Sequence, residues 1–341
     1  MTLVGTVVVG IEQPTLSQPA GEPLRDPTQY VSRQHVLRLR LVVERRQVEL
    51  AGRRLWALTY NGSYMPPTLR FRPGDQMDLT LVNRLDQPTN LHLHGLHVSP
   101  QRNSDNIFLS IRPGETFHYL YRFPPDLTPG TYWYHSHADP NSAGQVAGGL
   151  SGIIIVDGLE QHLPEALKGI TEHVIALKDF QVAGNSIRME GLTIGAPTNR
   201  TVNGQLNPRI PIRPGETQLW RLANISSNIY YLLRLQGQAF HVIAQDGNPV
   251  SQVWSAGTLL IPAAARYDVL VRGGQPGETG LETLAYSTGP AGNQFPEKTL
   301  ATVVSAGTPV PPVAMPTAFA TMEDLSGASV AMRRTIVFSE D

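Results

Sequence analysis

The chain contains no cysteine among its 341 residues. This absence excludes disulfide bonds, thiolate metal sites and cysteine nucleophiles from these residues. No charge sign dominates, because 27 Lys and Arg residues nearly balance 28 Asp and Glu residues, and we therefore expect no nucleic-acid partner. No apolar run approaches the roughly 20 residues that a membrane-spanning helix needs. The opening stretch, MTLVGTVVVGIEQPTLSQ, has neither the basic region nor the cleavage site of a signal peptide.

Turns and short alternating segments are what the sequence has in abundance. It holds 31 glycines and 28 prolines, and turn dipeptides such as Asn61-Gly62 separate its apolar runs. Residues 35–50, 76–85 and 116–123 alternate apolar with polar side chains, which predicts strands with one buried face. Many short strands joined by such turns predict an all-β protein built as a sandwich or a barrel.

An internal duplication predicts two copies of one fold. Residues 59–83, TYNGSYMPPTLRFRPGDQMDLTLVN, match residues 201–224, TVNGQLNPRIPIRPGETQLWRLAN, with one deletion. The length also exceeds what one hydrophobic core usually serves. The predicted organisation is a first domain over 1–158, a helix-like linker over 159–170, a second domain over 171–306, a proline-rich linker over 307–331 and the first strand of a truncated third domain over 332–341.

Two His-x-His pairs carry the chemistry of the first half. Along a strand, alternate side chains share a face about 6.6 Å apart, so His92 and His94 point to one side and Leu93 to the core. His135 and His137 form a second pair of the same kind. Neutral imidazole binds copper, zinc, iron or nickel, and two convergent pairs predict a metal site. The alternative is hydrogen-bonded polar residues on half-exposed strands.

Three further features separate the ligand candidates from the other histidines. His97 lies an odd number of positions after His94, so we expect it on the opposite face, in packing or at the surface. His118 has no partner pair in its strand. The remaining histidines are isolated in the sequence and are predicted to be structural: His35, His162, His173 and His241.

The two pairs also carry a family resemblance. NLHLHG (90–95) and GTYWYHSH (130–137) resemble the first two copper motifs of the multicopper oxidases, a laccase-like family. NGQLNPRIPIRPGETQLWRLAN (203–224) and FHVIAQDGNPV (240–250) resemble the copper-free middle domain of three-domain members. The resemblance implies tandem cupredoxin-like Greek-key β-sandwich domains.

The resemblance also implies roles for individual residues. His92 would bind the type 2 copper and His94 a type 3 copper. His135 and His137 would bind copper in the same trinuclear cluster. Asp105, eleven residues past His94, would assist proton delivery. In the alternative interpretation, Asp105 is a turn residue in a polar loop.

Departures from the family pattern limit what these 341 residues would do by themselves. The motifs His-x-x-His-x-His and His-Cys-His-x-x-x-His are absent, and they supply the other half of the trinuclear cluster. The type 1 copper needs a cysteine, which the chain lacks. The implied activity is one-electron oxidation of a small phenol-like or metal-ion donor coupled to reduction of dioxygen to water. We expect the chain alone to be inactive, with a C-terminal domain or a second chain completing the cluster.

Two other interpretations remain open. A cupredoxin-fold protein could store copper or act as a scaffold without catalysis, although such a protein has no need for both pairs. A cupin-like metalloenzyme would have a glutamate shortly after His-x-His, and GLHVSPQRN (95–103) contains none. The family resemblance implies a periplasmic or secreted protein.

Overall fold

The computed structural model describes residues 21–190, 197–321 and 325–337. Strands dominate these residues, so the predicted all-β class is confirmed. The described helical elements are α1 (Ser142–Gly148) and two 3₁₀ turns, η1 (Leu159–His162) and η2 (Glu165–Leu167). None of the helices in the described ranges has the length and apolar character needed to cross a membrane.

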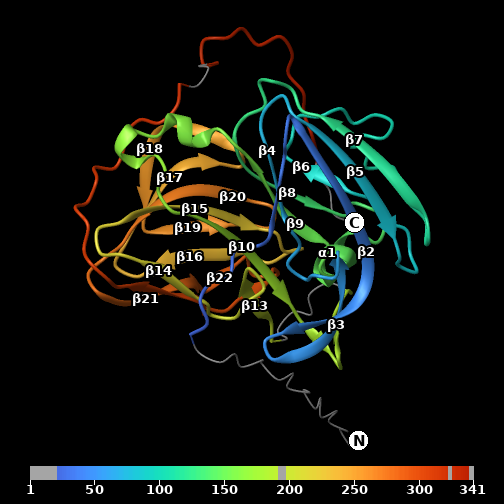
Figure 1. Cartoon of the computed structure of the whole chain (residues 1–341), viewed down its shortest axis with the longest axis horizontal. Coiled ribbons are helices and arrows are strands. Elements are labelled where there is room, and N and C mark those ends of the chain that lie inside the picture. The colour runs from blue at the N-terminus through green and yellow to red at the C-terminus, as the bar shows by residue number, and fades with distance from the viewer. Residues whose placement is uncertain (1–20, 191–196, 322–324, 338–341) are drawn as a thin grey trace, which may run out of the picture.

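The first sandwich consists of two sheets, drawn blue to green on the right of Figure 1. One sheet has the order β1 (Gln29–Val31), β4 (Thr68–Phe71), β9 (Ser151–Val156), β8 (Gly130–His135), β6 (His92–His94). The other has the order β11 (Val182–Ala183), β12 (Ser186–Ile187), β3 (Arg53–Tyr60), β2 (Val36–Leu50), β5 (Gln76–Asn83), β7 (Thr116–Arg122). The inward faces of both sheets form one apolar core.

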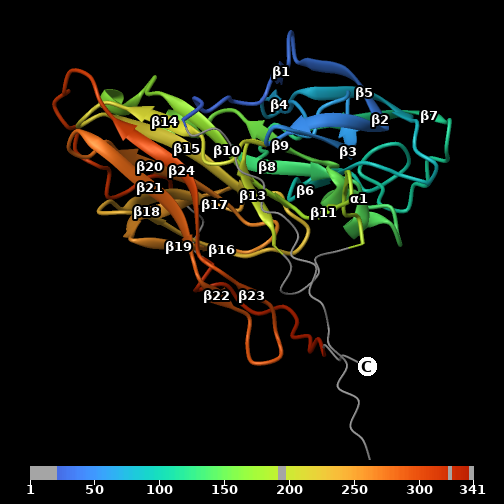
Figure 2. The ribbon, with the colours of Figure 1, turned by 90° about the horizontal axis from the view of Figure 1, so that it is seen from below.

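The second sandwich lies beside the first and is drawn mostly yellow to orange in Figure 1. One sheet has the order β13 (Asn199–Val202), β10 (Glu172–Phe180), β15 (Thr217–Asn224), β20 (Arg266–Arg272), β17 (Phe240–Gln245), β18 (Asn248–Ala256). The other has the order β14 (Arg209–Ile212), β24 (Lys298–Ser305), β21 (Gly277–Leu284), β16 (Tyr231–Leu235), β19 (Thr258–Ile261). A hairpin of β22 (Tyr286–Ser287) and β23 (Gln294–Phe295) projects from this sandwich in Figure 2.

The sequence repeat corresponds to a repeated backbone pattern. β2 pairs in parallel with β5, and β10 pairs in parallel with β15. Each copy also has an Asn-Gly turn of the same shape: Asn61 and Asn203 both have φ 52°, and their glycines have φ 76° and 77°. Asn and Gly are the residues that tolerate this left-handed backbone, which explains why both turns keep the dipeptide.

The strand predictions agree with the observed elements, while the linkers differ in detail. The helix-like segment 159–170 forms the two 3₁₀ turns, whose leucines pack into an apolar cluster with the second sandwich. α1 was not predicted. Residues 182–187, inside the predicted second domain, join the edge of a first-sandwich sheet because β12 pairs with β3. Residues 325–337 form no strand, and 338–341 lie outside the described residues. The domain boundaries stay a prediction.

The two sandwiches meet across buried polar contacts as well as apolar ones. Lys178 on β10 is 1 % exposed. Its Nζ donates to the carbonyl oxygens of Tyr64, Gly149 and Ser151 at 3.0, 2.7 and 3.3 Å, and lies 4.3 Å from the centre of the Tyr64 ring. Burial lowers the pKa of Lys178 to about 7. One side chain of the second sandwich therefore satisfies three buried carbonyls of the first.

Leu93, between His92 and His94 on β6, tests how strongly the core holds this strand. Its side chain is fully buried in the first core. We expect Leu93→Ala to lower the free energy of unfolding by about 2–5 kcal/mol, because it removes buried apolar area and leaves a cavity. Leu325→Ala is the control, since Leu325 is 65 % exposed and should cost less than about 0.5 kcal/mol. Equal denaturant midpoints for the two variants would contradict the burial of Leu93.

Candidate metal centre

Antiparallel pairing of β6 with β8 brings the two histidine pairs together. The register places His92 opposite His135 and His94 opposite Trp133. β6 is the edge strand of its sheet, and β8 lies next to it between β6 and β9 (Figure 1). Side chains directly opposite on one face of such a pair lie about 4.5–5.5 Å apart at Cβ. The backbone register alone therefore gathers imidazoles from two distant segments of the chain.

Three of the four predicted ligands form one compact group. One ring nitrogen from each of His92, His94 and His135 can be chosen so that all three lie within 4.8 Å of one another. The His137 ring is adjacent, with its centre 5.4 Å from that of His92 and 5.8 Å from that of His135. His137 is not a member of the compact group. Its backbone N–H donates to Asn90 Oδ1 at 2.7 Å, so the Asn90 side chain holds the backbone at His137.

Asp105 fixes the orientation of His92. The two Asp105 carboxylate oxygens lie 3.1 and 3.0 Å from His92 Nδ1, and Oδ1 also accepts from the Leu93 backbone N–H at 2.9 Å. Because a carboxylate accepts, Nδ1 carries a hydrogen, and Nε2 is the ring nitrogen that remains to bind a metal. A second partner that sets the free nitrogen in this way is the usual arrangement for a metal-binding histidine.

His135 is oriented by the main chain. Its Nδ1 donates to the Ser136 carbonyl oxygen at 2.8 Å, which leaves Nε2 as the free nitrogen. Burial lowers the pKa of His135 to about 3, and burial, with a smaller contribution from Arg266, lowers the pKa of His94 to about 4. Both rings are consequently neutral near pH 7, which is the form that binds a metal.

The spacing of two nitrogens fits a single metal ion. His94 Nδ1 lies 3.4 Å from His135 Nε2. Two nitrogens bound at 2.0–2.1 Å to one tetrahedral ion are about 3.3 Å apart. With neutral rings, soft-to-borderline nitrogen donors and no thiolate, this donor set suits copper as well as zinc. The residues present therefore fit the copper that the resemblance implies.

An aromatic side chain supports the centre from the side of the second sandwich. Trp133 stacks on His135, with ring centres 4.1 Å apart and planes 22° apart, and lies 5.0 Å from the His94 ring. The indole is 4 % exposed and packs in a cluster with Val174 and Ala223 of the second sandwich. Trp133 was not predicted from the sequence. The only signal is its place two residues before His135 on the same strand face.

Hydrogen bonds from side-chain amides hold the loops around the metal centre in place. Asn90 Nδ2 donates to the carbonyl oxygens of Ile107 and Leu109 at 2.9 and 3.0 Å, which closes the loop that carries Asp105. Gln145 of α1 accepts from Thr89 Oγ1 at 2.8 Å and from Ser136 Oγ. α1 therefore has a structural role at the metal centre, through the residues next to His135.

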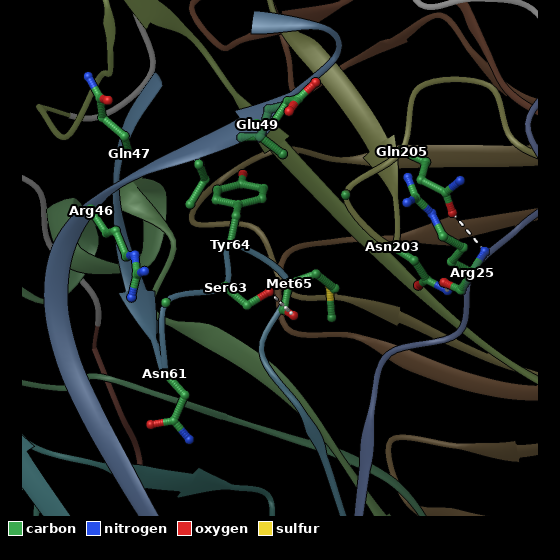
Figure 3. Close-up of a pocket in the computed structure, with 14 residues that line it drawn as sticks. Arg25, Arg46, Gln47, Glu49, Asn61, Ser63, Tyr64, Met65, Asn203 and Gln205 are labelled. Atoms are coloured by element: carbon green, nitrogen blue, oxygen red, sulfur yellow. Dashed lines mark hydrogen bonds between the residues drawn. The ribbon is translucent and has the colours of Figure 1, made fainter. Parts of the chain in front are cut away.

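Within the described residues, no other histidine belongs to this compact group. His97 is exposed, as predicted, and His118 Nδ1 faces Thr80 Oγ1 on the neighbouring strand. A separate cavity of about 500 Å³ lies between the β2–β3 hairpin and the Asn203-Gly204 turn (Figure 3). Three amide side chains that line it, Asn61, Asn203 and Gln205, bond the protein; Gln205 Oε1, for example, accepts from the Arg25 N–H at 2.7 Å.

Comparison with known proteins identifies the family. Residues 42–161 and 171–280 each match a family model described as multicopper oxidase, and together they span more than half of the chain. The chain belongs to the multicopper oxidase family, whose members bind copper and use dioxygen with reducing substrates.

Individual relatives agree with this assignment. The chain is 28% identical over 333 residues to copper resistance protein A of Pseudomonas syringae pv. tomato, covering 82% of this chain and 52% of that protein. It is 32% identical over 227 residues to the iron transport multicopper oxidase FET3 of Candida albicans, covering 62% and 34%. The chain thus spans about half the length of the copper resistance protein.

Solved structures share the fold. A multicopper oxidase from Campylobacter jejuni, described as a metallo-oxidase, superposes with a TM-score of 0.78 at 25% identity, over 90% of this chain and 65% of that one. McoA of Aquifex aeolicus superposes with a TM-score of 0.76 at 20% identity, over 91% and 71%. The tandem cupredoxin-like architecture predicted from the sequence is confirmed.

The contact between Asp105 and His92 leads to a test. We expect Asp105→Asn to weaken copper binding by about 10–100-fold, because the amide no longer fixes the His92 ring as the carboxylate does. Affinity is measured by competition with a calibrated chelator. Asp126→Asn, a change at an exposed carboxylate, is the control and should leave the affinity unchanged. An unchanged affinity in Asp105→Asn would show that His92 needs no such partner.

Gly95 allows a second test, because it follows His94 directly with φ +86°. A Cβ there would lie 2.7 Å from Arg266 Nη2 and 3.3 Å from the Tyr132 ring. Gly52 has φ +72° with nothing within 4 Å of an added Cβ. Gly52→Ala therefore measures only the cost of placing alanine in a left-handed backbone, about 1 kcal/mol. We expect Gly95→Ala to lower the free energy of unfolding by about 2–4 kcal/mol, clearly more than Gly52→Ala. Equal losses of unfolding free energy in the two variants would mean that Arg266 and Tyr132 move away from the added Cβ at no cost.

Proposed function

We propose that this chain is part of a laccase-like oxidase that couples one-electron oxidation of a reducing substrate to the four-electron reduction of dioxygen to water. The observation that carries the proposal is the compact group of His92, His94 and His135. Three imidazoles with converging ring nitrogens are a suitable donor set for a metal ion. Copper bound there supplies the redox chemistry, and the protein supplies its geometry and surroundings.

Each of the four histidines and Asp105 has its own role in this proposal. His92, with Nδ1 held by Asp105, would bind the type 2 copper through Nε2. His94 would bind a type 3 copper. His135, whose Nε2 lies 3.4 Å from His94 Nδ1, would bind copper in the same cluster together with His137. Asp105 also assists proton delivery, since it is the carboxylate in contact with His92 and reduction of dioxygen to two waters consumes four protons.

The 341 residues supply half of the trinuclear ligands and no type 1 site, because the chain has no cysteine. A further polypeptide segment, on the same or a second chain, supplies the remaining ligands. The reducing donor, a small phenol or a metal ion, gives up its electrons at that segment. By its resemblance to the family, we propose a periplasmic or secreted location for the protein.

Copper binding by the purified chain tests the proposal. We expect bound Cu(II) to show nitrogen ligation in its electron paramagnetic resonance spectrum and to lack intense blue colour, since blue copper needs a cysteine. His135→Ala should reduce the affinity by more than the roughly 10–100-fold that loss of a supporting residue costs. His97→Ala is the matched control, because His97 lies outside the group.

Two results would contradict the proposal. Strong blue colour would mean that the ligand set is wrong, and equal affinity in the His135→Ala and His97→Ala variants would remove His135 from the site. Oxygen uptake by the copper-loaded protein assembled with the remaining ligands separates an oxidase from a copper store or scaffold. A copper store would bind the metal and consume no oxygen with a phenol donor.

A further inference from the structure

Arg266 is a residue of the second sandwich that reaches the metal centre of the first. It begins β20 and is 4 % exposed. Its Nε donates to the Thr131 carbonyl oxygen at 3.2 Å, and its guanidinium carbon lies 5.6 Å from the centre of the Tyr132 ring. Both contacts are on β8, the strand that ends at His135. Arg266 thus contacts β8, the strand that carries the candidate ligand His135.

The far side of the guanidinium faces the other ligand strand. A Cβ placed on Gly95 would lie 2.7 Å from Arg266 Nη2, and Gly95 is the residue next to His94. The positive charge is therefore close to His94, in agreement with the contribution of Arg266 to the lowered pKa of that ring. An arginine keeps its charge even when it is buried.

Negative charge near Arg266 only partly compensates this charge. Asp246 Oδ1 lies 3.2 Å from Arg266 Nη1, yet the Asp246 side chain is 43 % exposed and well screened. Asp268, 1 % exposed, is engaged by Arg221 at 3.3 Å and by the Thr131 N–H at 3.2 Å. The Asp105 carboxylate, which contacts His92, opposes Arg266 at His94, but its effect on the pKa of that ring is smaller than that of Arg266. Arg266 therefore adds a positive field at His94 that the nearby carboxylates only partly offset.

We propose that Arg266 is a positioning residue that holds β8 in place and disfavours the more highly charged state of a metal at His94 and His135. The inference rests on the proposed copper function. Because Cu(II) carries one more positive charge than Cu(I), the fixed guanidinium weakens binding of Cu(II) more than binding of Cu(I). The second sandwich, which has no His-x-His pair of its own, thereby sets the redox preference of the centre.

The test compares Cu(II) and Cu(I) affinities of the 341-residue chain by competition with chelators specific for each state. We expect Arg266→Gln to raise the ratio of Cu(II) to Cu(I) affinity about tenfold, a change that one buried charge can cause at this range. Arg266→Lys keeps the charge and should leave the ratio within about threefold. Arg234→Gln, at an arginine paired with Glu282 on the far sheet, is the control for charge removal elsewhere.

A second variant keeps the test decisive if Arg266→Gln does not fold. Asp246→Asn removes a carboxylate that partly offsets the charge of Arg266, and it should lower the ratio of Cu(II) to Cu(I) affinity. A ratio that is the same in parent, Arg266→Gln and Asp246→Asn would overturn the inference, and equal shifts in Arg266→Lys and Arg266→Gln would assign the effect to packing alone. Failure of the proposed function looks different: in that case His135→Ala leaves copper binding unchanged in the parent background.

Discussion

The antiparallel pairing of β6 with β8 is the constraint on which the candidate metal centre depends. It places His92 opposite His135, although the two residues lie 43 positions apart in the sequence. A shift of one residue in this register would turn the imidazoles of one strand to the opposite face and Leu93 out of the core. Burial of Leu93 in the first core and the convergence of the histidines are therefore two results of one alignment.

Support for this alignment comes from both sandwiches. Within the first, Asp105 bonds both the His92 ring and the Leu93 backbone, so one carboxylate holds a ligand and its strand. From the second, Arg266 bonds the Thr131 carbonyl on β8, and Trp133 packs against second-sandwich side chains while stacking on His135. The second sandwich has no His-x-His pair, yet it contacts β8 through Arg266 and adds a positive charge close to His94.

Much of the fold could be predicted because strands carry a period of two that survives in the sequence. The alternation in residues 35–50 corresponds to β2, and the repeated Asn-Gly turns correspond to matching backbone shapes at Asn61 and Asn203. α1 could not be predicted, because its seven residues, SAGQVAG, lack an apolar periodicity. The return of residues 182–187 to the first sandwich depends on an edge strand that offers a partner, which no local pattern records.

The candidate ligands and the core residue between them follow from the sequence by itself, since residue type and alternation decide which side chains share a face. Tertiary structure alone decided that His94 and His135 have nitrogens 3.4 Å apart while His137 stays outside the compact group. It also decided that Asp105 contacts His92 and that Arg266 lies against Gly95. These contacts join segments far apart in the chain, and their distances depend on how two sheets and two sandwiches pack, which spacing along one strand cannot specify.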